Sequence, residues 1–437
     1  MQTRKRFLQG AAATVAATAF TPRAVASAAP FDPTSWSSVR AQFDLDPHTT
    51  NLTTFLLAPH PRPVREAIAR HARGLNRDAK RYLDQYEAKT EDRVRSAAAG
   101  YLDVDADEIA LTDSTTMGLG LLYGGLRLGE GTEVVTTTHD FYSTHEALRL
   151  RALRTGADVR KIRLYADAQH VSVDEVVTAV RRGIGPKTRA LAVTWVHSST
   201  GVKLPVPAIA DVVRSINRDR SPEERMLLCV DGVHGFGIES TTPRELGCDF
   251  LVSGCHKWLF GPRGTGLIWG RPEAWATVTP TIPTFDRRAF GPWLAGETPP
   301  ASGIPGLPRA LAMTPGGFHS FEQRWALAEA FEFRRRIGRA RAATRTHDLA
   351  HRLKEGLREV KSVRLVTPPD APLSAGLVCC TVGDRDPDDV VRHLYDRARI
   401  VASVTPYSTR YVRFGPTIVN SKADVDRAVR AVHAIAG

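Results

Sequence analysis

Short apolar runs alternate with amphipathic stretches between about residues 109 and 270. Such runs are typical of buried parallel strands, and a three-to-four-residue apolar period is typical of the helices that cover them. The predicted strands are Ile109–Leu111, Glu133–Thr137, Val159–Ile162, Arg189–Val196, Met226–Val230, Phe250–Ser253 and Gly266–Trp269. The predicted helices between them are Gly118–Leu126, Ser143–Thr155, Val173–Gly183 and Pro207–Asn217. The alternation predicts an α/β fold with a mostly parallel central sheet flanked by helices.

The pattern changes on both sides of this region. Residues 31–60 are rich in Pro and Thr, which predicts an N-terminal arm without regular elements. Residues 61–320 form the predicted large α/β domain, interrupted by a Pro- and Gly-rich excursion over Thr281–Gly317. Residues 321–437 combine a continuous bridging helix over Phe321–Val360 with a smaller C-terminal α+β domain. The elements predicted in that smaller domain are strands Leu377–Val382, Ile400–Ala402 and Tyr411–Phe414 and helices Pro387–Ala398 and Lys422–Ile435.

The first 30 residues have the layout of an export signal. Basic residues at Arg4–Arg6 precede a weakly apolar stretch and the small residues Ala24–Ala28. The pattern resembles a twin-arginine signal, with Lys5 in place of one arginine. It predicts a periplasmic or extracellular protein; the alternative is a cytoplasmic protein with an N-terminal extension. No other stretch has the roughly 18 uncharged apolar residues that a membrane span requires.

The charge and the cysteines exclude several functional classes. The net charge of +12 over 437 residues comes from arginines that are scattered among acidic residues, without a run of five like charges. This distribution favours a small anionic ligand over nucleic acid. The five cysteines show neither a disulfide framework nor a Cys-x-x-Cys metal pattern. The two histidines His139 and His145 lack a third ligand and do not predict a metal site.

Lys257 stands out because it lies between a predicted buried strand and a glycine-rich turn, and Trp258–Phe260 follow it. Removal from water lowers the pKa of a lysine, and a neutral amine is a nucleophile that can form a Schiff base. The alternative is a lysine at a loop exit whose amine reaches the solvent.

Three other strand ends carry unusual polar residues. Asp231 ends a predicted strand, where its carboxylate needs a positive partner unless it only caps the next turn. The hydroxyls of Ser114, Thr115 and Thr116 begin a predicted helix and can cradle a phosphate, although an ordinary helix cap explains them as well. His139 can stack on a planar ligand. Loops beyond the carboxyl ends of parallel strands converge, so an amine, a carboxylate, a phosphate cradle and a stacking group are predicted at one site. Pyridoxal 5'-phosphate requires this combination.

At this point the chain also resembles a known family. The segments Val230-Asp-Gly-Val-His-Gly235 and Ser253-Gly-Cys-His-Lys-Trp-Leu-Phe-Gly-Pro-Arg-Gly264 are similar to those of class V aminotransferases of pyridoxal-phosphate fold type I, especially the isopenicillin N epimerase-like members. The resemblance runs from about residue 50 to the C-terminus. It implies a fold type I transferase and a homodimer in which a partner loop completes each site. Gly317 fits that loop, but Phe318 replaces its usual threonine.

The resemblance also implies a role for each matching residue. Lys257 is the Schiff-base lysine, Asp231 the partner of the pyridine nitrogen, and Arg413 the clamp for the substrate carboxylate. The remaining implied cofactor contacts are the phosphate turn Ser114, Thr115 and Thr116, the stacking residue His139 with Phe141 or Tyr142 as substitutes, the ring-hydroxyl contact Ser198, the ring neighbour His234 and the phosphate neighbour His256.

The resemblance implies chemistry at the α-carbon of an amino acid, through an aldimine on Lys257. Aminotransfer is the first expectation from the family; epimerisation or C–S bond cleavage is the alternative, and a non-catalytic ligand-binding relative is a further one. Epimerisation requires an acid or base on the opposite face of the ring, and Tyr142 or His139 is the candidate for this catalytic role. Cysteine desulfurases of this class carry a nucleophilic cysteine before the Arg413 motif, but the loop Ser403–Arg410 has none. Cys379 and Cys380 lie in a predicted strand. A persulfide mechanism is therefore not expected.

Overall fold

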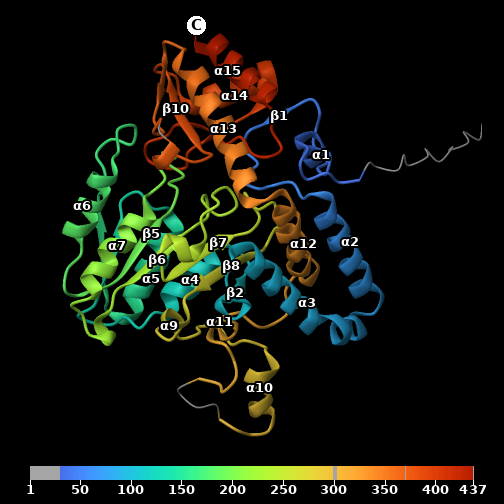
Figure 1. The fold of residues 1–437 in the computed structure, drawn as a ribbon, viewed down its shortest axis with the longest axis vertical. Coiled ribbons are helices and arrows are strands. Elements are labelled where there is room, and N and C mark those ends of the chain that lie inside the picture. Colours follow the sequence, from blue (N-terminus) through green and yellow to red (C-terminus); the bar gives the residue numbers. More distant parts are fainter. Residues whose placement is uncertain (1–29, 299–302, 370, 437) are drawn as a thin grey trace, which may run out of the picture.

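The computed structural model describes residues 30–298, 303–369 and 371–436. The predicted export signal falls outside these residues apart from its last position, and it stays a prediction. The described chain forms a large α/β body with a smaller domain on top and a projecting segment that contains helix α10 (Arg287–Leu294) below (Figure 1).

The large body is built on a seven-stranded sheet with the order β2-β8-β7-β6-β5-β3-β4. Strand β8 is antiparallel to its neighbours β2 and β7, and the other pairs are parallel. In chain order the strands are β2 (Ile109–Thr112), β3 (Glu133–Thr137), β4 (Asp158–Ile162), β5 (Thr188–Thr194), β6 (Leu227–Asp231), β7 (Phe250–Gly254) and β8 (Gly266–Gly270). All seven predicted strands are confirmed, with ends within two residues of the prediction.

Alternate strand residues face two separate apolar layers. Val134 and Val252 pack on the side of α4 (Thr115–Gly125) and α5 (Tyr142–Thr155). The neighbouring residues Val135 and Leu251 pack on the opposite side. The helices on that side are α3 (Ala79–Leu102), α6 (Val173–Gly183), α7 (Val206–Asn217) and α12 (Phe321–Ile337), and α2 (Arg62–Arg77) lies against α3 and α12. Both faces are covered, so the loops at the strand ends are left to form the site.

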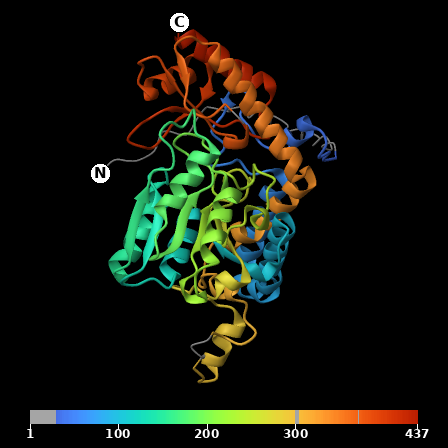
Figure 2. The ribbon, with the colours of Figure 1, turned by 60° about the vertical axis from the view of Figure 1, so that its left-hand side comes forward.

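The smaller domain has its own core between a four-stranded antiparallel sheet and three helices (Figure 2). Its elements are β9 (Val363–Leu365), β10 (Val378–Val382), β12 (Ser403–Val404), β13 (Val412–Phe414), α13 (Arg339–Arg358), α14 (Pro387–Ala398) and α15 (Lys422–Ala436). The prediction that residues 31–60 contain no element is wrong. The arm forms α1 (Trp36–Arg40) and β1 (Thr50–Asn51), and β1 pairs in parallel with β11 (Ile400–Val401) because the small domain offers a free strand edge.

Two further expectations need correction. The predicted continuous helix over Phe321–Val360 is divided at Gly338, whose φ of +89° breaks the helical path between α12 and α13. The excursion over Thr281–Gly317 contains the helices α10 (Arg287–Leu294) and α11 (Arg309–Ala312). Helix α10 projects from the large body at the end opposite the small domain, as both ribbon views show (Figures 1 and 2). The short helix α8 (Pro243–Leu246) lies in the connection between β6 and β7, and α9 (Pro272–Trp275) follows β8.

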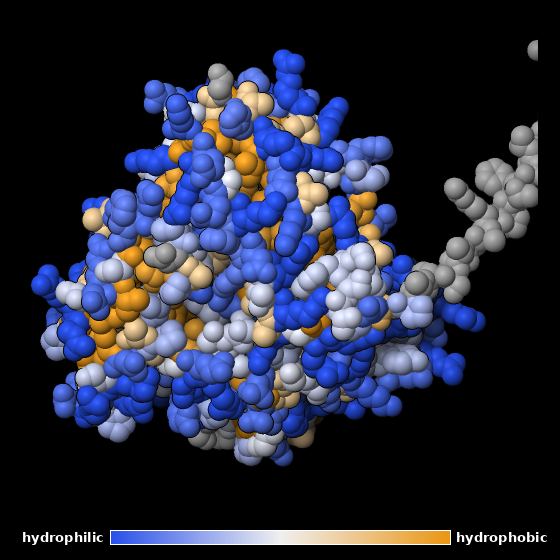
Figure 3. All heavy atoms as spheres, turned by 45° about the horizontal axis from the view of Figure 1, so that its top comes forward, coloured by the Kyte–Doolittle hydropathy of each residue, from blue (hydrophilic) through white to orange (hydrophobic). Residues whose placement is uncertain are grey.

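Charged and polar side chains dominate the face seen in Figure 3, with smaller hydrophobic patches between them. Among the described residues, no helix is both long and apolar enough to cross a membrane.

Candidate active site

Lys257 lies in the loop that follows β7, at the carboxyl end of the parallel strands. The side chain is partly buried, and Trp258 beside it is almost fully buried and stacks on Phe55 with ring centroids 5.6 Å apart. Burial lowers the pKa of Lys257 to about 8, although the nearby Asp231 carboxyl opposes this shift and the positive charge of Arg413 adds to it. A lysine with this pKa is about one-tenth neutral at pH 7, a far larger neutral fraction than that of an ordinary lysine.

Asp231 is the last residue of β6 and is 1% exposed. Its Oδ1 accepts a hydrogen bond of 3.0 Å from the backbone N–H of Val233. Burial raises the pKa of Asp231 to about 7, against the lowering effects of that hydrogen bond and of Lys257. Within the described chain, no cation lies within ion-pairing distance of this carboxyl. The site therefore fits a ligand that brings its own positive charge, as the protonated pyridine nitrogen of pyridoxal phosphate does.

The predicted phosphate cradle forms where α4 begins beside the end of β7. Ser114 caps α4, and its Oγ accepts from Met117 N at 3.1 Å. The buried Thr115 accepts a hydrogen bond from Gly254 N at 2.7 Å through its Oγ1. A methyl group added to Gly254 would lie 2.8 Å from the His256 ring and 3.1 Å from the Thr115 hydroxyl, so these two side chains meet over Gly254.

His256 supplies a separate sign that a ligand belongs here. Its Nδ1 is buried and has no hydrogen-bond partner among the described residues. A buried polar atom without a partner is costly, and a phosphate oxygen next to Thr115 would satisfy it. Thr116, in contrast, is exposed on the first turn of α4. The residues present thus fit the phosphate group of the cofactor.

His234 is buried beside Trp258, whose indole N–H donates to His234 Nδ1 over 3.1 Å. Burial lowers the pKa of His234 well below its ordinary value. The imidazole is therefore neutral with its proton on Nε2, so it presents a donor on the side away from Trp258.

Arg413 projects from β13 of the small domain and is 3% exposed. Its Nη1 donates to the carbonyl of Ser198 at 2.8 Å, and its Nε donates to Ser403 Oγ at 3.2 Å. Its guanidinium carbon lies 5.0 Å from the centre of the Phe55 ring. Among the described residues, no carboxylate lies within ion-pairing distance of Arg413. Its position is thus fixed by neutral groups, which leaves its charge for an anionic ligand.

His139 stacks on two rings. One is Tyr165, at a centroid distance of 3.9 Å, and the other is His197, the residue before Ser198, at 5.3 Å. The Nε2 atom of His139 accepts a hydrogen bond from Leu164 N at 3.2 Å. Phe141, the predicted substitute, packs instead against Tyr407 at 5.8 Å. Tyr407 donates or accepts a hydrogen bond of 2.6 Å with Ser198 Oγ. Phe141 is therefore linked to Ser198 through Tyr407, and His139 is linked to it through His197.

Two residues at the site were not predicted. Asp140 Oδ1 accepts from Thr194 N, and its Oδ2 accepts from Thr136 Oγ1 and Thr137 N, so it ties the ends of β3 and β5 together. The sequence signal that could have identified Asp140 is an acidic residue shortly after a Thr-rich strand end. Tyr407 belongs to the loop before the Arg413 motif, and no pattern in the sequence of that loop marks it as a site residue.

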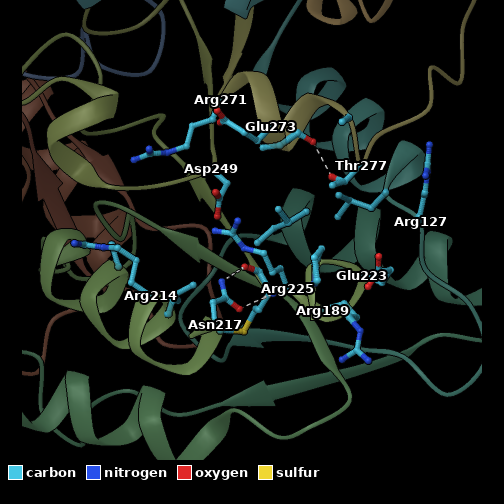
Figure 4. A pocket seen from close by; sticks show the side chains of 18 of the residues that line it. Arg127, Arg189, Arg214, Asn217, Glu223, Arg225, Asp249, Arg271, Glu273 and Thr277 are labelled. Carbon is cyan, nitrogen blue, oxygen red and sulfur yellow. Dashed lines mark hydrogen bonds between the residues drawn. The ribbon is translucent and has the colours of Figure 1, made fainter. Parts of the chain in front are cut away.

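A cavity of about 950 Å³ lies elsewhere, at the amino ends of β5 and β6 (Figure 4). Its walls carry Arg127, Arg189, Arg214, Arg225 and Arg271. Figure 4 shows these side chains pointing in different directions rather than towards one point. This cavity is separated by the length of the sheet from Lys257, which lies at the carboxyl ends.

Comparison with known proteins agrees with this geometry. The Aminotransferase class-V family model matches residues 58–427. The chain belongs to this family. It is 26% identical over 403 residues to isopenicillin N epimerase from Amycolatopsis lactamdurans, covering 91% of this chain and 98% of the relative. It is 30% identical over 236 residues to a cysteine desulfurase from Klebsiella pneumoniae, covering 50% and 54% of the two chains.

The fold is shared with C-DES, a cystine C–S lyase. A solved structure of a C-DES mutant with glycine linked to its pyridoxal-phosphate cofactor has a TM-score of 0.79 at 21% identity, covering 90% of this chain and 98% of that one. Family membership and the fit of the buried residues identify pyridoxal phosphate as the cofactor. The fold type I architecture is confirmed.

Proposed function

We propose that this protein moves a proton at the α-carbon of an amino acid in the manner of an epimerase. The observation that carries the proposal is the placement of Lys257, with its lowered pKa, between the buried carboxyl of Asp231 and the unpaired charge of Arg413. The end-to-end similarity to isopenicillin N epimerase supports epimerisation over the other reactions of the family.

Each part of the cofactor has matching residues. Thr115, Ser114 and His256 would hold the phosphate, and Asp231 would hold the ring nitrogen. Bound pyridoxal phosphate supplies a ring that withdraws electrons from the α-carbon. His234 offers its Nε2–H beside the ring, and Phe141 offers a flat apolar surface.

The chain itself supplies the proton transfer. Because the pKa of Lys257 is lowered to about 8, its Nζ is partly uncharged near neutral pH and accepts a proton from the α-carbon. Epimerisation also needs a donor that returns the proton to the other face. Tyr407 is our candidate, since burial raises its pKa to about 12 and its hydroxyl stays protonated. Tyr142, by comparison, is 68% exposed.

The substrate is held by its carboxylate. Arg413 is fixed by Ser198 and Ser403 and turns its remaining charge to the site. A carboxylate bound there also becomes separated from water, which strengthens the interaction.

Amino transfer is the second candidate, because the same residues support it and the family name describes it. Sulfur transfer through a persulfide has less support. All five cysteines are buried, and burial raises the pKa of Cys379 to about 12, so the thiolate required as a nucleophile is scarce.

We also propose a homodimer, as the family resemblance implies. Apolar side chains on the excursion around α10 support it: Phe285 is 62% exposed, Trp293 70% and Leu294 67%. Such a group of exposed apolar side chains on a projecting segment is typical of an interface.

The first experiment concerns Lys257. Wild-type protein reconstituted with pyridoxal phosphate should gain a visible absorption band, and borohydride should fix the cofactor to the peptide that contains Lys257. Lys257→Ala should lose both signals, whereas Lys187→Ala, at an exposed lysine before β5, should keep them. A wild-type protein that never binds the cofactor would refute the proposal.

The reaction type is then read from deuterium exchange. Incorporation of deuterium at the α-carbon together with the opposite stereoisomer, without keto acid, supports epimerisation. Stoichiometric keto acid would instead establish amino transfer.

A further inference from the structure

The segment between β1 and α2 crosses from the small domain to the loop that carries the reactive lysine. At its start, the carbonyl of Leu52 accepts a hydrogen bond of 2.8 Å from the backbone N–H of Gly415, two residues after Arg413. At its end, the backbone N–H of Ala58 donates to the carbonyl of His256 at 2.9 Å. One short segment therefore binds the small domain beside Arg413 and the large body beside the lysine.

Phe55 lies in the middle of this segment and is fully buried. Its ring stacks on Trp258, the residue after Lys257, with centroids 5.6 Å apart and an interplanar angle of 20°. The guanidinium carbon of Arg413 lies 5.0 Å from the centre of the same ring. Gly415 has no room for a methyl group against Cδ1 of Phe55, so the ring rests directly on the backbone that follows Arg413. A single ring thus contacts both the lysine loop and the carboxylate clamp.

The ring affects Arg413 without neutralising its charge. Burial lowers the pKa of Arg413, because the guanidinium has lost much of its hydration. A cation near an aromatic face is attracted to it, and more strongly when both groups are removed from water. Phe55 offsets part of the lost hydration in this way, whereas a carboxylate partner would use up the charge. The contact also restricts the side chain before a ligand arrives, which lowers the entropic cost of binding.

We propose that Phe55 is a positioning residue: it fixes Arg413 relative to Lys257 and thereby sets the affinity for the carboxylate of the substrate. It acts through Arg413, whose guanidinium binds the ligand. The inference rests on the proposed function, since it assumes a carboxylate at Arg413. Removal of the ring should weaken the binding of amino acids and leave the binding of the corresponding amines unchanged, because an amine does not use the clamp.

The test compares two ligands on the enzyme reconstituted with pyridoxal phosphate. The first is the standard amino acid that changes the absorbance of the bound cofactor most, and the second is the amine that remains when its carboxylate is removed. The absorbance change gives both dissociation constants. We expect the wild type to prefer the amino acid, and Phe55→Leu to reduce this preference about three- to tenfold through weaker binding of the amino acid.

Two further variants separate positioning from packing. Phe55→Met keeps most of the side-chain volume without a ring, so it should reduce the preference as Phe55→Leu does, and it serves as the test where the leucine variant folds poorly. Phe333→Leu makes the same change at a buried phenylalanine of α12, which packs against Phe31 and Phe43. This control should keep the wild-type preference.

Two results would overturn the inference and leave the proposed function standing: an unchanged preference in the Phe55 variants, or an equal loss of preference in Phe333→Leu. Equal affinity of the wild type for the amino acid and the amine would also overturn it, and would remove Arg413 from the proposed function while the proton transfer by Lys257 stands. If no amino acid changes the cofactor absorbance in any variant, the proposed function fails and the inference fails with it.

Discussion

At the scale of single residues, Asp231 and Lys257 show how the site prepares for a charged ligand. Burial raises the pKa of the Asp231 carboxyl to about 7 and lowers that of the Lys257 amine to about 8. Each group is driven towards its neutral form when the protein stands alone. A ligand that carries a positive ring nitrogen favours the charged carboxylate of Asp231 instead, because the two opposite charges compensate each other in the buried site.

Asp231→Asn should therefore affect stability and cofactor binding in opposite directions. The folded-state pKa of Asp231 lies above the unfolded value of 3.8, so its contribution to stability is lost as pH rises towards about 7. At pH 9 the wild-type carboxylate is charged and Lys257 is mostly neutral. We expect the cofactor-free variant to be more stable there by on the order of 1–3 kcal/mol, with a smaller gain at pH 5, because the gain shrinks as pH falls from about 7 towards the unfolded value of 3.8.

Thermal unfolding of both cofactor-free proteins at pH 5 and pH 9 measures this effect, and a titration with pyridoxal phosphate should show weaker binding by the variant. Equal unfolding temperatures at pH 9 would mean that Asp231 is not charged in the folded protein.

At the scale of elements, the site depends on close contact between the start of α4 and the end of β7. Gly254→Ala should place a methyl group 2.8 Å from the His256 ring and 3.1 Å from Thr115 Oγ1. We expect a loss of about 1–3 kcal/mol in stability and weaker binding of pyridoxal phosphate. Gly120→Ala, on an open face of the same helix, is the matched control, because it should be neutral or stabilising by up to about 1 kcal/mol. Chemical denaturation and cofactor titration measure both, and equal behaviour of the two variants would contradict this account of the cradle.

The burial and pairing of the strands and loops explain which features could be predicted from the sequence and which could not. The strands of the large sheet were predictable because they are buried on both faces and form compact apolar runs. Lys257, Asp231 and Thr115 were predictable because parallel strands bring their carboxyl ends together. The sequence could not show which of Phe141 and His139 stacks on the cofactor. Neighbouring loop residues point in different directions, and the placement of these two rings depends on their partners Tyr407 and Tyr165. The strand β1 was missed because its only partner, β11, lies about 350 residues away in the chain.

At the scale of the whole molecule, the projecting segment around α10 is the part of the fold least explained by one subunit. Within the described residues α10 has no buried side chain, and Trp293 and Leu294 are 70% and 67% exposed. Exposed apolar area of this kind is stabilised when a second copy covers it.

The double variant Trp293→Ser, Leu294→Ser should therefore shift the protein from dimer to monomer at micromolar concentration. Sedimentation velocity measures the shift directly. Tyr395→Ser, at a 43% exposed aromatic residue on α14, is the control and should remain dimeric. If a partner loop completes each site, as the family resemblance implies, the monomer should also bind pyridoxal phosphate less tightly than the dimer. A wild-type protein that sediments as a monomer would contradict the dimer, and a monomeric variant with unchanged cofactor affinity would show that each subunit completes its own site.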